Sequence, residues 1–214
     1  LLKHVYVKAR FNLAYSLYME QLSDKALTLF KEVTYHEQED KYNAHYYAGV
    51  IYFKNEDFDN ALDQFLLAQN RPEMYKLTAP YIVKIYLNKK QYKEVIIYAE
   101  THLDNTKDIN LEGKIILNRV AAEASFAQLN YREAIQYYTR VLLFSKSKGD
   151  VALFFNFGFS LEQVGKMVEA ADQYKIAALS KDTLGQLSAF RLGQIYIQLN
   201  QFNAAINAFQ TVLE

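Results

Sequence analysis

The stretch that decides the fold is residues 42–75, YNAHYYAGVIYFKNEDFDNALDQFLLAQNRPEMY. Small and apolar residues recur in it at intervals of three and four, which places their side chains on one face of an α-helix. Two such stripes are separated by the polar turn KNED at 54–57. The stretch therefore predicts two helices joined by a short turn, with acidic residues at the positive end of the second helix.

The same pattern recurs along the chain. The central small residue of the second stripe, Ala61, has counterparts at Ala26, Val95, Ala134, Ala170 and Ala205. Twelve positions before each of these stands a small or compact residue, namely Ala14, Gly49, Val83, Ala122, Gly158 and Gly193. The steps between the residues of this second set are 35, 34, 39, 36 and 35. The chain therefore has an internal period near 34 residues with short insertions, the longest around residues 104–110.

Close helix contact explains the small residues. We expect the first helix of each repeat to present its Gly or Ala where the second helix of the same repeat crosses it. A larger residue four positions after the central Ala, such as Phe65 or Tyr174, then fills the space toward the next repeat. One repeat cannot bury both stripes, so the repeats must stack into a continuous core.

The pattern resembles the tetratricopeptide repeat family, best in residues 42–75 at Ala48-Gly49, Tyr52, Phe58, Ala61, Phe65, Ala68 and Pro72. The resemblance implies an all-α fold: an α-solenoid of stacked antiparallel helix pairs forming a right-handed superhelix. It predicts a single array with repeats near 7–40, 42–75, 76–109, 115–148, 151–184 and 186–214. The position where the family carries a Trp-like residue departs from the pattern, because it holds Arg10, His45, Ala79, Asn118, Phe154 and Ala189. The third repeat matches least, and there we expect Pro80 in the first turn of a helix capped by Thr78.

Composition excludes several classes of protein. The chain has 214 residues with 24 Lys+Arg and 24 Asp+Glu, so its formal charge is zero and nucleic-acid binding is disfavoured. It contains no Cys, which rules out disulfides and thiolate metal sites. No signal peptide and no long uninterrupted apolar segment is visible, so we expect no membrane insertion. Both ends look cut, and we interpret the chain as a fragment of a longer protein.

No motif points to catalysis, a cofactor or a metal. The four histidines, His4, His36, His45 and His102, form no helical i+3 or i+4 pair of metal ligands. The acidic run of Glu37, Glu39 and Asp40 is interpreted as a solvated loop between repeats. There is no Gly-rich phosphate loop and no nucleophile-elbow serine. We therefore expect a non-catalytic protein without cofactors.

The resemblance also implies a binding face. In the family the first helices of the repeats line a concave groove that holds peptides. The residues at the lining positions here are Phe11, Tyr15, Tyr18, Tyr46, Phe53, Lys84, Arg119, Glu123, Phe126, Phe155, Phe159, Phe190 and Gln194. Aromatic side chains provide a large contact area at protein interfaces. The alternative is that they pack against neighbouring repeats as core.

The predicted partner is a protein or peptide of unknown identity. We expect a mostly apolar ligand, with Lys84, Arg119 and Glu123 adding polar selectivity. Some members of the family grip C-terminal carboxylates with Lys and Asn. Such a clamp is not expected, because the corresponding positions of the first repeat hold Phe11 and Tyr15.

A second hypothesis is assembly through the ends of the array. Ile206, Phe209, Val212 and Leu213 form an apolar stripe that should meet a following helix, which predicts self-association through the C-terminal helix. The residue usage, rich in Asn, Lys and Tyr, is typical of an AT-rich bacterial genome. It favours the bacterial cell envelope or periplasm as the location, with the cytoplasm as the alternative.

Overall fold

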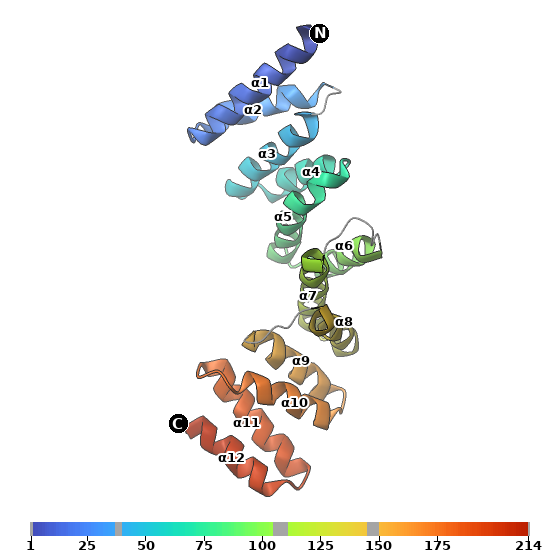
Figure 1. Cartoon of the computed structure of the whole chain (residues 1–214), viewed down its shortest axis with the longest axis vertical. Helices are drawn as coiled ribbons and strands as arrows, with labels where there is room; N and C mark the ends of the chain where they lie inside the picture. Colours follow the sequence, from blue (N-terminus) through green and yellow to red (C-terminus); the bar gives the residue numbers. More distant parts are fainter. Residues whose placement is uncertain (1, 37–39, 105–110, 145–149, 214) are drawn as a thin grey trace. The chain divides into compact units, whose positions relative to one another are not determined.

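The computed structural model describes residues 2–36, 40–104, 111–144 and 150–213. These residues contain twelve α-helices, one short 3₁₀ turn and no strand (Figure 1). The helices are α1 (Leu2–Met19), α2 (Ser23–Thr34), α3 (Asp40–Lys54), α4 (Phe58–Ala68), α5 (Tyr75–Asn88), α6 (Tyr92–Asp104), α7 (Leu111–Ala127), α8 (Tyr131–Phe144), α9 (Val151–Gln163), α10 (Met167–Ala177), α11 (Thr183–Gln198) and α12 (Phe202–Leu213). The predicted all-α fold of helix pairs is confirmed.

The chain divides into two compact units, residues 1–91 and 92–214. Unit 1 contains α1 to α5 and unit 2 contains α6 to α12. Within each unit every helix packs against the next one along the chain (Figure 1). In addition α1 packs against α3 and α3 against α5 in unit 1, and α9 packs against α11 in unit 2. These three pairs of alternate helices are therefore neighbours, and we call α1, α3, α5, α7, α9 and α11 the first helices.

The boundary between the units falls inside the third predicted repeat, 76–109. This is the repeat that matches the pattern least, because Val83 and Val95 replace the usual glycine or alanine. The predicted repeat bounds and the right-handed superhelix stay predictions.

The core lies where the repeat pattern predicts it. The central small positions are all buried: Ala26, Ala61, Val95, Ala134, Ala170 and Ala205. Of the larger residues four positions later, Phe30, Phe65, Tyr138 and Tyr174 are fully buried, whereas Phe209 on α12 is half-buried. The packing surfaces of the helices are thus set by the period of the sequence.

The glycines in the first helices permit close approach of an aromatic ring. A Cβ atom added at Gly49 would lie 2.8 Å from the Phe65 ring. The corresponding distances are 3.0 Å from Gly158 to Tyr174 and 2.6 Å from Gly193 to Phe209. Each ring belongs to the second helix of the same repeat, so the reason expected for the small residues is confirmed.

The turns after the first helices share one backbone conformation. Each contains a residue in the left-handed region: Gln21, Glu56, Lys90, Leu129, Gly165 and Asn200. In each turn the N–H of the next residue donates to a carbonyl five residues back, as from Asp57 to Tyr52 and from Asn130 to Ser125. This is the Schellman pattern that ends a helix. The six turns are separated by 35, 34, 39, 36 and 35 residues, the steps already found between the small residues.

Two local details differ in outcome. Asp57 caps the N-terminus of α4, its side chain accepting a hydrogen bond from the Asn60 N–H at 3.3 Å, as expected for an acid at that end. The expectation for Pro80 is wrong. The 3₁₀ turn Pro72–Met74 leads directly into α5, so Pro80 lies inside the helix rather than in its first turn. Thr78 is therefore not a cap: its buried hydroxyl donates to the Met74 carbonyl at 3.0 Å.

None of the described helices is long and apolar enough to cross a membrane.

Candidate peptide-binding face

All the predicted lining residues lie on first helices. Unit 1 contributes Phe11, Tyr15 and Tyr18 on α1, Tyr46 and Phe53 on α3, and Lys84 on α5. Unit 2 contributes Arg119, Glu123 and Phe126 on α7, Phe155 and Phe159 on α9, and Phe190 and Gln194 on α11. Four of them are exposed, namely Tyr15, Lys84, Phe190 and Gln194, and the others are half-buried. These side chains thus reach both solvent and their neighbours.

Tyr47 on α3 is the centre of the aromatic contacts in unit 1. Its ring centroid lies 5.2 Å from that of Tyr15 and 5.5 Å from that of Tyr18, both on α1. On its own helix it lies 5.1 Å from Tyr46, and on α2 it stacks on Phe30. The predicted aromatics of α1 and α3 are therefore brought together by a residue that the sequence reasoning did not select.

Tyr81 on α5 has the same role one repeat later. Its centroid lies 5.1 Å from Phe53 and 6.3 Å from Tyr46, and its ring stacks on Phe65 at 4.9 Å. Tyr47 and Tyr81 each stand two positions before the small residue of their helix, Gly49 and Val83. Because the two tyrosines are 34 residues apart, one repeat length, their recurrence could have identified this pair from the sequence.

Two lysines border the aromatic cluster of unit 1. The Lys54 Nζ lies 4.7 Å from the centre of the Tyr18 ring, toward its hydroxyl, to which it donates a hydrogen bond at 3.0 Å. The Lys84 Nζ lies 5.4 Å from the centre of the Phe53 ring. Both are cation–π contacts, and both side chains are exposed. We call Tyr15, Tyr18, Tyr46, Tyr47, Phe53, Tyr81, Lys54 and Lys84 the unit 1 cluster.

Tyr46 and Tyr47 of the unit 1 cluster stay protonated at neutral pH, because the pKa of each is raised. Burial, followed by the neighbouring Tyr81, raises the pKa of Tyr46 far above its usual value of 10.0. Burial, followed by Tyr15, raises the pKa of Tyr47 in the same direction. Neutral phenols can donate hydrogen bonds to acceptors on a ligand.

The face of unit 2 is built around Phe159 on α9. Its ring lies 5.8 Å from that of Phe126 on α7 and 6.3 Å from that of Phe155 on its own helix. Tyr131 on α8 lies 5.8 Å from Phe159 and 5.9 Å from Phe126, which closes a three-membered group. Phe155 also contacts Tyr174 on α10 at 5.7 Å. Three of the predicted residues thus meet here.

The charged residues predicted in unit 2 neutralise one another. Arg119 forms ion pairs with Asp150 at 2.6 Å and with Glu123 at 3.0 Å. Burial lowers the pKa of Arg119, but the hydrogen bonds and charges of Glu123 and Asp150 outweigh this and raise it above its usual value. A second charged group was not expected from the sequence: Glu162 accepts a hydrogen bond from the Tyr174 hydroxyl at 2.7 Å and lies 3.4 Å from Arg191.

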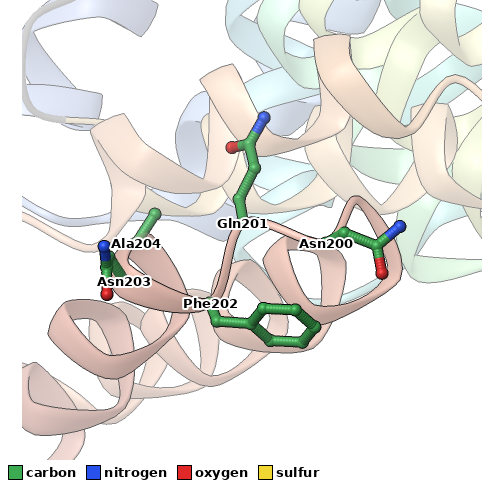
Figure 2. A pocket seen from close by; sticks show the side chains of 5 residues that line it. All are labelled: Asn200, Gln201, Phe202, Asn203 and Ala204. Carbon is green, nitrogen blue, oxygen red and sulfur yellow. The ribbon is translucent and has the colours of Figure 1, made fainter.

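The α11–α12 hairpin carries the last two predicted residues. Phe190 packs on Phe209 with ring centroids 5.9 Å apart, and it is 42% exposed. The turn of this hairpin has a shallow depression of about 450 Å³ lined by residues 200–204. Figure 2 shows that the five side chains point in different directions, so they do not converge on a ligand.

The described part of the chain contains no group of three His, Asp or Glu side chains able to hold a metal ion. Glu37 and Glu39 of the acidic run lie outside the described residues, whereas Asp40 is the first residue of α3. The buried His45 donates from Nδ1 to Gln64 Oε1 at 2.8 Å. His102 is half-buried, with its Nδ1 2.7 Å from the Tyr98 carbonyl.

Comparison with known proteins places these helices in a family context. Two family models, both described as "Tetratricopeptide repeat", match residues 11–74 and 188–214. No curated protein sequence matches the chain.

Solved structures resemble the chain over most of its length. The crystal structure of the MamA protein is similar with a TM-score of 0.63 at 14% identity, covering 82% of this chain and 92% of that one. The C-terminal part of a TPR repeat-containing protein from Cytophaga hutchinsonii gives 0.60 at 15%, with 95% and 78% covered. The apo form of RapI gives 0.59 at 16%, with 97% and 75% covered. At these identities the similarity concerns the fold.

Proposed function

Because the chain belongs to the tetratricopeptide repeat family, whose members are typically non-catalytic protein-interaction scaffolds, we propose that it binds a peptide or a partner protein along its first helices. The proposed surface is the groove lined by these helices. The chain is thus a scaffold for protein–protein interaction, and the first-helix face is the part of it that we assign to the ligand.

The observation that supports this proposal most is the partial exposure of a connected set of aromatic rings. A residue needed only for the core of a helix pair is fully buried, as Phe30 and Phe65 are. The rings of Tyr18, Tyr46 and Phe53 are instead half-buried, and that of Tyr15 is 38% exposed. Such rings gain further burial when a ligand covers them, and they lose little conformational entropy because they already contact one another.

The same contacts determine which substitutions can test the proposal. Alanine at Tyr46, Phe53 or Phe155 removes a ring that also packs internally, so it lowers stability as well as binding. Tyr15 and Phe190 are more exposed, at 38% and 42%, and are the better probes. Tyr35, 82% exposed just after α2, is a matched control that leaves the first helices unchanged.

The experiment is selection of random 12-residue peptides displayed on phage against the chain. The strongest peptide is then synthesised with a fluorophore, and its affinity is measured by fluorescence anisotropy. We expect Tyr15→Ala to weaken a peptide held by unit 1 about tenfold, Phe190→Ala to do the same for a peptide held by unit 2, and Tyr35→Ala to leave both unchanged. The proposal is contradicted if no peptide is enriched, or if Tyr35→Ala lowers the affinity as much as the substitutions on the first helices do.

Assembly through an end face is the second candidate function. Three apolar side chains follow one stripe of α12: Phe202 at 59% exposure, Ile206 at 55% and Leu213 at 87%. An apolar stripe of this kind is typical of an interaction surface. Multi-angle light scattering over a range of concentrations tests it. Assembly is supported if the measured mass rises with concentration and if Ile206→Asp abolishes that rise. The control Lys175→Asp, on the exposed side of α10, should not abolish it. A constant monomer mass contradicts assembly.

A further inference from the structure

We propose that the peptide face of unit 1 selects acidic segments, binding Asp or Glu side chains through Lys54 and Lys84 and apolar side chains on the intervening rings. The inference rests on the proposed function and specifies its ligand. It differs from the sequence-based expectation of a mostly apolar ligand, and it concerns unit 1 alone.

The two lysines belong to one connected surface. Lys54 contacts Tyr18, Tyr18 contacts Tyr47, and Tyr47 contacts Tyr46. Tyr46 then contacts Tyr81, which contacts Phe53 beneath Lys84. The chain of contacts crosses α1, α3 and α5. A ligand that lies across these three helices therefore meets a cation at both borders of the aromatic cluster.

Neither lysine is neutralised within the described part of the chain. No Asp or Glu oxygen among the described residues lies within 4.0 Å of the Nζ of Lys54 or Lys84. Their partners are the rings of Tyr18 and Phe53 instead. A cation held over a ring keeps its charge and its donors for an incoming carboxylate, and its side chain is already ordered.

Basic residues outnumber acidic ones on the three first helices of unit 1, although Arg10 is paired with Glu32 and Glu56 and Asp57 follow Lys54 in the next turn. The helices α1, α3 and α5 contain seven Lys and Arg side chains, namely Lys3, Lys8, Arg10, Lys41, Lys54, Lys76 and Lys84. Their only carboxylate is Asp40, at the start of α3, whereas Lys54 is the last residue of that helix. The chain as a whole is neutral, so this excess is local. A local positive face attracts an acidic segment and disfavours a basic one.

In unit 2 the arginines of the first helices have carboxylate partners. Arg119 is paired with Glu123 and Asp150, and Arg191 is paired with Glu162. Because each of these arginines already has a carboxylate partner, a ligand carboxylate has to compete with Glu123, Asp150 or Glu162. Charge selectivity is therefore assigned to unit 1.

The tyrosine hydroxyls add donors between the two cations. The unit 1 cluster has five phenols, and because Tyr46 is hydrogen-bonded to Tyr81 and Tyr47 to Tyr15, the donors left for a ligand are those of Tyr15, Tyr18 and Tyr81. A phenol donates readily to a carboxylate, and such charge-assisted bonds are stronger than neutral ones. The ring faces accept aliphatic side chains between the acidic residues. The fitting ligand is an Asp- or Glu-containing segment with interspersed apolar residues.

The experiment uses the same phage library of random 12-residue peptides. Selection against the native chain is compared with selection against the double variant Lys54→Gln and Lys84→Gln. We expect an excess of Asp and Glu over the unselected library for the native chain, and loss of that excess for the variant. The best synthetic peptide should bind the variant about tenfold more weakly, because two exposed charge contacts are removed.

A matched control is the double variant Lys25→Gln and Lys31→Gln on α2. It removes the same charge, and Lys31 also makes a cation–π contact, 5.2 Å from the centre of the Tyr52 ring. Binding by this control should stay within about twofold of the native chain. Added salt should weaken binding to the native chain more than to the Lys54 and Lys84 variant.

Two results overturn the inference while leaving the proposed function intact. One is enrichment of peptides without acidic excess whose binding still depends on Tyr15. The other is an equal loss of affinity in the α2 control, which would show a general charge effect. If no peptide is enriched at all, the proposed function fails, and the inference fails with it.

Discussion

The ring of Tyr47 lies almost parallel to that of Phe30, with centroids 5.4 Å apart and an angle of 14° between the planes. Tyr81 has the same relation to Phe65, at 4.9 Å and 18°. In both pairs a tyrosine of a first helix covers a fully buried phenylalanine of the preceding second helix. These stacks connect consecutive helix pairs in unit 1, and they also support the rings of the proposed binding face.

Replacing Tyr81 by Leu should lower the free energy of unfolding, because the leucine keeps apolar contact but loses the stacked ring. Aromatic pairs contribute about 0.5–1.5 kcal/mol beyond the area they bury. A double-mutant cycle with Phe65→Leu, followed by urea unfolding and circular dichroism, should give a coupling near 1 kcal/mol. Tyr35→Leu, at an 82% exposed position, should change little. Additive effects of the two substitutions would show that the stack contributes nothing of its own.

Gly49→Ala should destabilise the chain even though alanine favours helix by about 1 kcal/mol. The new Cβ would lie 2.8 Å from the Phe65 ring, which is itself fully buried and has no room to move. Overpacking of this kind costs about 1–3 kcal/mol, so the clash outweighs the helix propensity. Thermal unfolding measures the difference. In a Phe65→Leu background the ring is absent, and there the same alanine should be neutral or stabilising; a loss in both backgrounds would refute the steric explanation.

Leu129→Gly should stabilise the chain by about 1 kcal/mol, because a left-handed backbone costs an L-residue roughly that amount and glycine nothing. Leu129 has φ 61° in the turn after α7 and is 69% exposed, so little packing is lost. The control is Leu143→Gly in α8, which is 76% exposed but helical and should lose about 1 kcal/mol. Melting temperatures of the two variants should therefore move in opposite directions.

The packing of the helices was predictable because it follows directly from side-chain size. Ala61 and Gly49 stand where two helices cross, and Phe65 stands where a ring fills the space beside them. A sequence that repeats this order of small and large residues specifies the same contact. The burial of these residues could therefore be predicted from the sequence. The predicted lining residues likewise lie on first helices, since helical periodicity fixes which face a residue occupies.

The parts that sequence reasoning missed depend on geometry that residue type does not specify. Leu129 and Lys90 adopt the left-handed backbone conformation, although their residue types do not predict it as glycine does at Gly165. The pairing of Arg119 with Asp150 joins α7 to the residue that caps α9, and no spacing rule indicates it. Pro80 was placed in a first turn because proline favours that position, but the preceding 3₁₀ turn starts the helix earlier.

His45 should make stability depend on pH. Burial lowers the pKa of His45 below the reference value of 6.5, more than its hydrogen bond to Gln64 raises it. The unfolded chain therefore binds a proton more readily than the folded chain, so the free energy of unfolding should fall as the pH drops below 6.5. The pKa of His102 is lowered in the same direction, chiefly by burial, and adds to the effect.

The measurement is urea unfolding at about pH 7.5 and about pH 5.5, where histidine titration dominates the difference. His45→Gln should flatten the pH dependence relative to the native chain, and adding His102→Gln should flatten it further. Asn203→Gln, which changes no titratable group at an exposed position of α12, should leave it as it is. An unchanged slope in the double variant would mean that carboxylates rather than these histidines carry the dependence.

Asp150 has two structural roles that two substitutions can separate. Its side chain accepts the Leu153 N–H at 3.1 Å, which caps α9, and it also pairs with Arg119 at 2.6 Å. Asn caps a helix about as well as Asp, so Asp150→Asn loses only the ion pair. Because the Arg119 side chain is 41% exposed, that loss should stay below about 1 kcal/mol.

Asp150→Ala removes the cap as well and should cost about 1 kcal/mol more than Asp150→Asn in urea unfolding followed by circular dichroism. Salt separates the two contributions further, because it screens the ion pair and leaves the cap. The difference in free energy of unfolding between the native chain and Asp150→Asn should therefore narrow at high NaCl. The difference between Asp150→Asn and Asp150→Ala should stay constant. Equal losses of stability for both variants would assign the whole effect to the ion pair between Asp150 and Arg119.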